Sequence, residues 1–240
     1  MKFYKNTSKR LVAGLGVVCL LSVLLSSCLK TNDEIYNPPP SAFVSFIHAT
    51  PDIPPLDFYL DNNRVNANPL IYGSYIDYFR AFTGTRAANF YNQGTTTKVI
   101  SDTLHLKQDS AYSVYLVKGA SHPEVLTITD LVSKPTAGNA SIRFVNVSPD
   151  APAVNFAKKD SVAMVSSKSF KGYTGFMPIK GDATYTFEVR QTGTNTVLAT
   201  LASVKLNSGF VYTIYFHGLV GGTTATDKLA ADIITNAYYN

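Results

Sequence analysis

Apolar and polar residues alternate along most of the chain in short runs. A period of two is the pattern of a β-strand that buries one face. Residues 42–49 and 140–147 both show it, and turn-forming Gly, Asn, Asp and Pro residues separate such runs. No segment keeps a long helical period. The pattern therefore predicts an all-β fold of short strands, typical of a β-sandwich.

One turn sequence occurs twice. Thr50-Pro51-Asp52-Ile53-Pro54 follows the first of these two runs, and Ser148-Pro149-Asp150-Ala151-Pro152 follows the second, 98 positions later. Proline fixes φ, and aspartate can accept a hydrogen bond from the backbone ahead of it. We interpret both sequences as rigid corners between strands, although two aspartates could alternatively bind a cation. The predicted structural turn residues are Pro51, Asp52, Pro54, Pro149, Asp150 and Pro152.

The repeat extends beyond the corner. Tyr173 lies 98 positions after Tyr75, and Tyr212 lies 100 positions after Tyr112. A short linker with Pro and Gly, residues 134–139, separates the two copies. We predict two tandem β-sandwich domains, one over residues 41–134 and one over residues 139–240.

The amino-terminal residues have the features of a bacterial export signal. An apolar run from Leu11 to Leu25 is too short to span a bilayer comfortably. It ends in Leu25-Ser26-Ser27-Cys28, which resembles the bacterial lipobox, where the cysteine is acylated. We predict a lipoprotein signal peptide at residues 1–27 and lipidation at Cys28; the alternative is an ordinary signal peptide. The basic residues that precede the apolar run are Lys2, Lys5, Lys9 and Arg10.

Residues 28–40 are predicted to form the lipidated cysteine and a polar tether that ends in three prolines. Asn32-Asp33-Glu34 resembles the acidic tracts of surface lipoproteins of the Bacteroidetes type. We therefore expect a bacterial cell-envelope protein that is lipid-anchored in the outer membrane and exposed at the cell surface. Its expected partner is the membrane, to which the lipid anchor attaches it.

The charge of the chain does not indicate a nucleic-acid partner. The formal net charge is +5, but four basic residues belong to the predicted signal, which leaves 17 basic against 16 acidic residues, or +1. Removal of the signal also removes Cys19, so Cys28 is the remaining cysteine. No disulfide framework and no cysteine-based metal site is expected.

The first corner and its strands resemble a known bacterial family. Residues 46–61 are similar to the signature of the domain-of-unknown-function 4397 family, a strand, His-Ala-Ser-Pro-Asp-Ala-Pro, and a strand that ends in Asp-Gly. The second copy has Asn146 in place of His48, and Lys180-Gly181-Asp182 is similar to the family's glycine turn. The resemblance implies paired immunoglobulin-like β-sandwiches on an exported, often lipid-anchored protein. The family has no established activity, and the resemblance implies a role in adhesion.

His48, Asp52 and Asp57 form the strongest candidate for a metal or catalytic site, because one imidazole and two carboxylates can ligate a divalent metal. The second copy has Asn146 and Asn155 at the positions of His48 and Asp57, which favours structural hydrogen bonds. No nucleophile or phosphate-loop motif is present. We predict neither enzyme activity nor a cofactor, and retain a metal-dependent enzyme at His48 and Asp52 as the alternative.

An aromatic run in the first copy is the candidate ligand-binding platform. Aromatic side chains can stack on a sugar or a peptide, although in many sheets they fill the core. We predict a non-catalytic binding or adhesion module for a protein or glycan, without nucleic acid. The alternative is a structural spacer or accessory subunit of an envelope complex. The proposed ligand-binding residues are Tyr75, Tyr78, Phe79, Phe82 and Tyr91.

Overall fold

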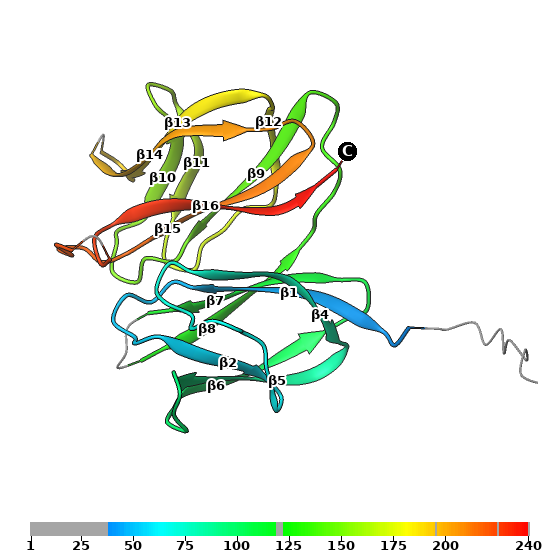
Figure 1. Ribbon diagram of the computed structural model, residues 1–240. Helices are drawn as coiled ribbons and strands as arrows, with labels where there is room; N and C mark the ends of the chain where they lie inside the picture. Colours follow the sequence, from blue (N-terminus) through cyan, green and yellow to red (C-terminus); the bar gives the residue numbers. More distant parts are fainter. Residues whose placement is uncertain (1–37, 119–121, 195, 225, 240) are drawn as a thin grey trace, which may run out of the picture. The chain divides into compact units, whose positions relative to one another are not determined.

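A computed structural model describes residues 38–118, 122–194, 196–224 and 226–239 (Figure 1). The predicted signal peptide, Cys28 and most of the tether lie outside the described residues. Pro39–Asn240 form one compact unit. In the ranges given, every regular element is a strand, and no helix long and apolar enough to cross a membrane is found. The prediction of an all-β fold made of two sandwiches is confirmed.

The first sandwich consists of two four-stranded sheets, in the orders β4-β1-β7-β8 and β3-β2-β5-β6. Strands β1 and β7 pair in parallel, and the other pairs are antiparallel. The strands are β1 (Ser41–His48), β2 (Leu56–Leu60), β3 (Asn63–Arg64), β4 (Tyr75–Phe82), β5 (Gly84–Asn92), β6 (Lys98–Leu106), β7 (Ala111–Val117) and β8 (Glu124–Asp130).

The second sandwich repeats this arrangement, with sheets in the orders β12-β9-β15-β16 and β11-β10-β13-β14. Strands β9 and β15 form its parallel pair. Its strands are β9 (Asn139–Asn146), β10 (Val154–Lys158), β11 (Ala163–Lys168), β12 (Met177–Lys180), β13 (Ala183–Gln191), β14 (Val197–Leu206), β15 (Phe210–His217) and β16 (Ala230–Tyr238).

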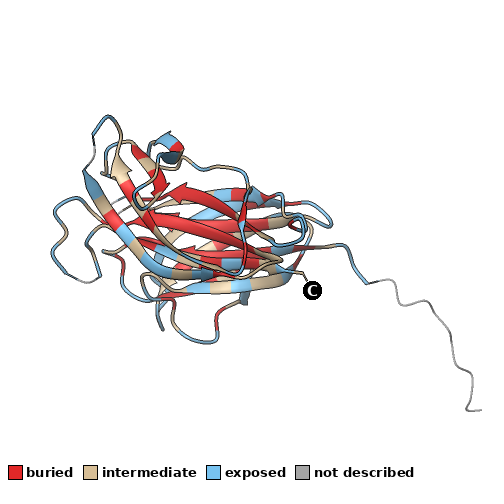
Figure 2. Cartoon of the chain, turned by 90° about the horizontal axis from the view of Figure 1, so that it is seen from above, coloured by how far each residue is buried: buried red, intermediate tan, exposed pale blue. Residues whose placement is uncertain are grey.

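Each sandwich has a core of stacked phenylalanines contributed by both of its sheets. In the first, the ring of Phe46 lies 5.0 Å from Phe58 and 4.9 Å from Phe90. In the second, Phe156 lies 4.9 Å from Phe144 and 5.1 Å from Phe187. All of these rings are buried. Figure 2 shows that the buried positions concentrate on the strands, while the loops at both ends are largely exposed.

A third apolar cluster joins the two sandwiches. Its members come from the outward faces of β4-β1-β7-β8 and β12-β9-β15-β16, which we call the inner sheets. Both faces of these sheets are therefore covered, which explains why β7 and β15 are buried along nearly their whole length. The buried members of this cluster are Ile47, Ala49, Tyr115, Val117, Ile128, Val145, Val147, Tyr215 and Ile234.

A buried polar network lies beside this cluster. The guanidinium of Arg143, on β9, is 2% exposed and donates to Asp130 Oδ1 of the first sandwich at 2.5 Å. It also donates to Ser113 Oγ at 2.8 Å and to Thr213 Oγ1 at 2.7 Å. A buried charge is tolerated only when it is paired and hydrogen-bonded, and Arg143 meets both conditions with partners from the two sandwiches.

Candidate functional site

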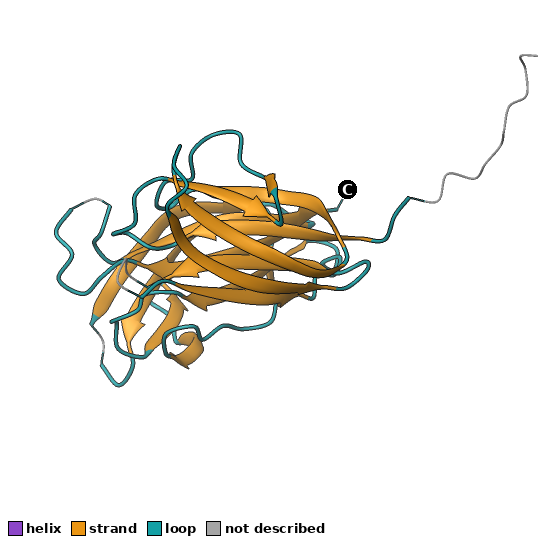
Figure 3. Ribbon diagram, turned by 90° about the horizontal axis from the view of Figure 1, so that it is seen from below, coloured by secondary structure: helices purple, strands orange, loops and turns teal. Residues whose placement is uncertain are grey.

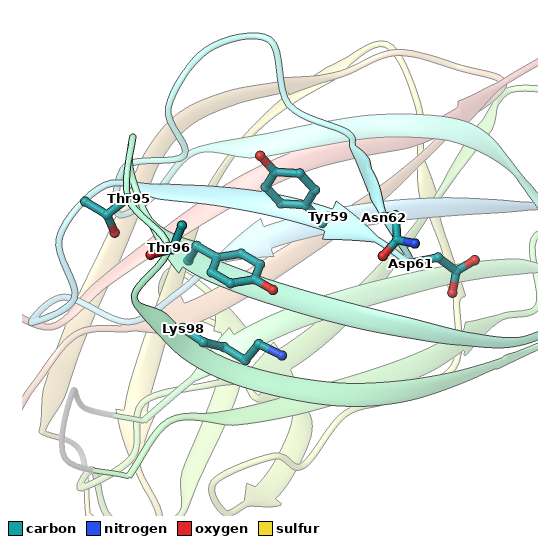
Figure 4. Close-up of a pocket in the computed structure, with 7 residues that line it drawn as sticks. Tyr59, Asp61, Asn62, Thr95, Thr96 and Lys98 are labelled. Atoms are coloured by element: carbon teal, nitrogen blue, oxygen red, sulfur yellow. The ribbon is translucent and has the colours of Figure 1, made fainter.

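The outer face of the sheet β3-β2-β5-β6 carries an open hollow of about 480 Å³ (Figure 4). Its walls come from β2, from the turn that follows β2, and from the hairpin between β5 and β6. In Figure 4, Tyr59 lies between Thr95 at one side and Asp61 with Asn62 at the other. We call this hollow the tyrosine groove; it is lined by Tyr59, Asp61, Asn62, Tyr91, Thr95, Thr96 and Lys98.

Strand alternation places both tyrosines on the outside of the sheet. Phe58 and Phe90 pair across β2 and β5 and point into the core, so their neighbours Tyr59 and Tyr91 point outward. The two tyrosine rings meet edge to face, with centroids 5.4 Å apart and planes at 82°. Both rings are half-buried, so each keeps apolar surface open to a ligand.

Polar groups surround the two rings. Lys98 pairs with Tyr91 across β5 and β6, and its Nζ lies 5.5 Å from the Tyr91 ring centroid. Asp61 adopts a positive φ of 53°, and its carboxylate accepts from Arg86 Nη1 at 3.1 Å and from the Ala87 N–H at 2.9 Å. Thr95 Oγ1 donates to the Asn92 carbonyl at 2.9 Å. The groove thus combines an aromatic floor with fixed hydrogen-bonding groups at its rim.

The equivalent hollow of the second sandwich has a different chemistry. Register places Ala157 where the first copy has Tyr59, and Arg190 where it has Tyr91. Arg190 forms an ion pair with Glu188 at 2.6 Å and donates to the Ser161 carbonyl at 2.8 Å. None of the described residues that line this hollow is aromatic. The outward-facing tyrosine pair therefore distinguishes the first copy from the second.

The five aromatic residues predicted to bind a ligand do not form one patch. Tyr75 and Phe82 are 45% and 60% exposed, but they lie at opposite ends of β4. Phe79 packs on the core of the first sandwich. Tyr91 lies on the other sheet, where it lines the tyrosine groove.

Tyr78 belongs to the polar network between the sandwiches. Its hydroxyl donates to Asp130 Oδ2 at 2.5 Å and accepts from Asn236 Nδ2 at 2.9 Å. Burial, followed by the charge of Asp130, raises the pKa of Tyr78, so its hydroxyl stays protonated. The side chain that the sequence suggested for ligand stacking instead stabilises the contact between the two sandwiches.

Tyr59 is the groove residue that the aromatic run did not indicate. It stands outside that run, but alternation in Leu56-Asp57-Phe58-Tyr59-Leu60 turns Tyr59 outward once Phe58 is assigned to the core. That alternation is the signal that could have identified it. Its proximity to Tyr91 depends on the pairing of β2 with β5, which separate sequence segments do not reveal.

His48 has a structural role at the first corner. It is fully buried, and its Nδ1 accepts the Thr50 N–H at 3.3 Å. In the second corner, Asn146 Oδ1 accepts the Ser148 N–H at 3.0 Å. Burial lowers the pKa of His48 to about 4, so the imidazole is neutral at neutral pH and can accept this hydrogen bond.

The two carboxylates near His48 do not converge on it. Asp57 forms an ion pair with Arg64 at 2.6 Å and accepts the Gly94 N–H at 2.9 Å. Asp52 is exposed, whereas Asp150, its counterpart in the second copy, accepts the Val220 N–H at 3.0 Å. Among the described residues, no group of three or more His, Cys, Asp or Glu side chains is arranged to hold a metal ion.

Comparison with known proteins identifies a family for part of the chain. Residues 42–157 match the sequence model of a family described as "Domain of unknown function (DUF4397)", which confirms the family predicted from the first corner. No curated protein matches the chain.

Two solved structures show a distant similarity. One is a family CBM26 module from Eubacterium rectale Amy13K in complex with maltoheptaose, at 7% identity and a TM-score of 0.27, covering 82% of this chain and 97% of that chain. The other, described as alpha-glucan binding by a streptococcal virulence factor, has 10% identity and a TM-score of 0.24, covering 74% and 92%. At these scores neither structure bears on the ligand of this chain.

Proposed function

We propose, from the site itself, that the chain is a non-catalytic carbohydrate-binding module. Its ligand lies across the tyrosine groove. The family whose model matches residues 42–157 is described as being of unknown function. The observation that carries this proposal is the outward pair of Tyr59 and Tyr91, whose rings meet edge to face at 5.4 Å inside a polar rim.

A sugar ring matches this combination of groups. Its C–H faces are apolar and rest on aromatic rings, whereas its hydroxyl groups need donors and acceptors at the edge. The groove offers Lys98 as a donor, Asn62 as donor and acceptor, and the hydroxyl groups of Thr95 and Thr96. A volume of about 480 Å³ lies in the range of small-molecule sites, which fits a short stretch of an oligosaccharide.

The groove binds without cleaving in this proposal. Glycosidic hydrolysis uses two carboxyl groups that flank the scissile bond. Asp61 is the carboxylate among the residues that line the groove, and it already accepts from Arg86 and Ala87. A single carboxylate held in this way does not supply the acid and base pair.

We also propose that Cys28 carries a lipid anchor and that the two sandwiches stand on the bacterial outer membrane. The sequence Leu25-Ser26-Ser27-Cys28 supports this proposal. A Cys28→Ala variant that keeps its membrane partition would contradict it.

The binding proposal is tested with a glycan array followed by calorimetry on residues Pro39–Asn240. The expected result is binding of at least one oligosaccharide, and a loss of about tenfold or more in affinity for Tyr59→Ala with Tyr91→Ala. Phe82→Ala is the matched control, because Phe82 is an exposed aromatic residue of the same sandwich outside the groove. An affinity unchanged by the double substitution would contradict the proposal.

A structural spacer is the second candidate, and the buried Arg143–Asp130 pair favours it. This pair connects the two sandwiches directly, as a spacer requires. If the chain is a spacer, no glycan on the array should bind. Binding of a partner protein should be lost when the relative orientation of the two sandwiches is disturbed. The array result therefore separates the two candidates.

A further inference from the structure

Basic residues gather at the end of both sandwiches where the chain enters β1, which we call the tether end. Strand pairing brings the start of β1 beside the end of β4, through Ser41 and Phe82, and the start of β5 beside the end of β6. In the second sandwich it brings the end of β12 beside the start of β9, through Lys180 and Asn139. Exposed acidic residues at this end include Asp109, Asp160 and Asp182. The basic residues there include Arg80, Arg86, Lys107, Lys180 and Lys205, and Arg86 forms an ion pair with Asp61.

The tether ends of the two sandwiches lie on the same side of the molecule. Asp130, the last residue of β8, forms an ion pair with Arg143 in the middle of β9, so the tether end of the first sandwich lies beside β9. The Gly181 N–H donates to the Gly138 carbonyl, and Tyr238 pairs with Phe210 at the close of the last strand. Figures 1 and 3 show the first described residues and the carboxyl terminus at this common end.

Large apolar side chains are exposed among these cations. Phe82 and Tyr238 are 60% and 66% exposed. The guanidinium carbons of Arg86 and Arg80 each lie 5.9 Å from an aromatic ring centroid, Arg86 over Phe82 and Arg80 over Phe43. Aromatic residues are the side chains that are enriched at the headgroup level of membranes, and basic residues are attracted to anionic headgroups.

We propose that the tether end rests on a membrane surface that contains anionic lipids. The basic residues attract the lipid headgroups, and Phe82 and Tyr238 enter the interface between headgroups and acyl chains. The chain that precedes the described fold supports this occupant, because the tether that begins at Cys28, the proposed lipid anchor, joins the fold at Pro39, next to the start of β1.

This contact is separate from the tyrosine groove and does not depend on carbohydrate binding. It also differs from the lipid anchor, since it uses side chains of the folded unit. On a membrane, it would give the folded unit a fixed orientation, with the corners at Asp52 and Asp150 facing away from the bilayer.

Co-sedimentation with lipid vesicles tests the proposal. The sample is unlipidated Pro39–Asn240, the compact unit that holds every strand described above. It should bind vesicles of phosphatidylcholine with about 30% phosphatidylglycerol and not vesicles of phosphatidylcholine alone. Lys107→Glu with Lys205→Glu should weaken binding by about tenfold or more, because each basic residue near a charged surface adds to the attraction. Phe82→Ser should also weaken binding.

The control reverses two charges away from this end, with Lys168→Glu and Lys228→Glu. The control variant should bind vesicles like the parent chain, and circular dichroism should show the same melting for all variants. Two results would overturn the proposal: no preference for anionic vesicles, or an equal loss in the control. Heparin provides a further check. If the chain binds heparin as tightly as it binds vesicles, and Phe82→Ser does not weaken heparin binding, the partner is a soluble polyanion and the proposal is overturned. The Lys107 and Lys205 variant should keep its oligosaccharide affinity, which separates this contact from the groove.

Discussion

Arg143 of the second sandwich and Asp130 of the first form an ion pair at 2.5 Å in which both side chains are almost completely buried. The pair connects sequences from different repeats, and the hydroxyl groups of Ser113, Thr213 and Tyr78 complete its hydrogen bonds. Two copies of one β-sandwich are thereby joined through polar as well as apolar contacts.

Removal of one partner should destabilise both sandwiches. Arg143→Leu leaves Asp130 buried without a counter-charge, and the free energy of unfolding should fall by about 3–5 kcal/mol. Because the network includes residues of both sandwiches, the parent chain should unfold in one transition. Tyrosine fluorescence and far-ultraviolet circular dichroism can both monitor it, since the chain has no tryptophan. Asp130→Asn with Arg143→Leu should recover part of the loss. Two separate transitions in the parent, with only one of them moved by Arg143→Leu, would show that the sandwiches fold independently.

The fold was largely predictable from local patterns, whereas the contact between sandwiches was not. Alternation, the two corners and the spacing of the repeats indicate strands and their order. The hydrogen bonds of Tyr78 reach Asp130 and Asn236, which lie 52 and 158 positions away. Nothing near Tyr78 in the sequence distinguishes a hydroxyl group in such a network from one that is open to a ligand.

The two copies of the corner vary in an informative way. A histidine and an asparagine are interchangeable when one acceptor atom is needed for the N–H two residues ahead, as His48 and Asn146 provide. The groove was harder to predict, because Tyr59 and Tyr91 come from strands separated by β3 and β4 and meet only through strand pairing.

His48 should make the stability of the chain depend on pH. Its pKa is about 4 in the folded state and near 6.5 when exposed, so the folded state favours the neutral ring. The stabilising contribution is complete above about pH 6.5 and decreases as the pH falls toward 4. Linkage predicts a loss of about 2 kcal/mol between pH 7.5 and pH 5. The measurement is urea unfolding at both values.

His48→Asn is the matched variant for this test, since it gives the first corner the residue of the second. It should keep the hydrogen bond from Thr50 and remove the part of the pH dependence that His48 contributes. If the free energy of unfolding falls by the same amount in the parent chain and the variant between pH 7.5 and pH 5, His48 does not contribute to the pH dependence and the prediction is wrong.

Gly181 should be sensitive to substitution because another backbone segment passes close to it. A Cβ atom at Gly181 would lie 2.5 Å from the Cα and 2.7 Å from the N of Ser208. Gly181→Ala should therefore cost about 1–3 kcal/mol of unfolding free energy. Gly175, where a Cβ would meet nothing within 4 Å, is the control, and Gly175→Ala should change stability by less than about 1 kcal/mol. Thermal melts of the two variants compare them directly, and equal melting temperatures would refute the close approach.

The most direct test of carbohydrate binding is a nuclear magnetic resonance titration of Pro39–Asn240 with an oligosaccharide selected on the array. If the tyrosine groove is the site, the largest changes in amide chemical shift will map to Tyr59, Tyr91 and Lys98, and residues around Arg190 in the equivalent hollow will stay unchanged. Shifts centred on the second sandwich, or the absence of shifts at the two tyrosines under saturating ligand, would contradict the account.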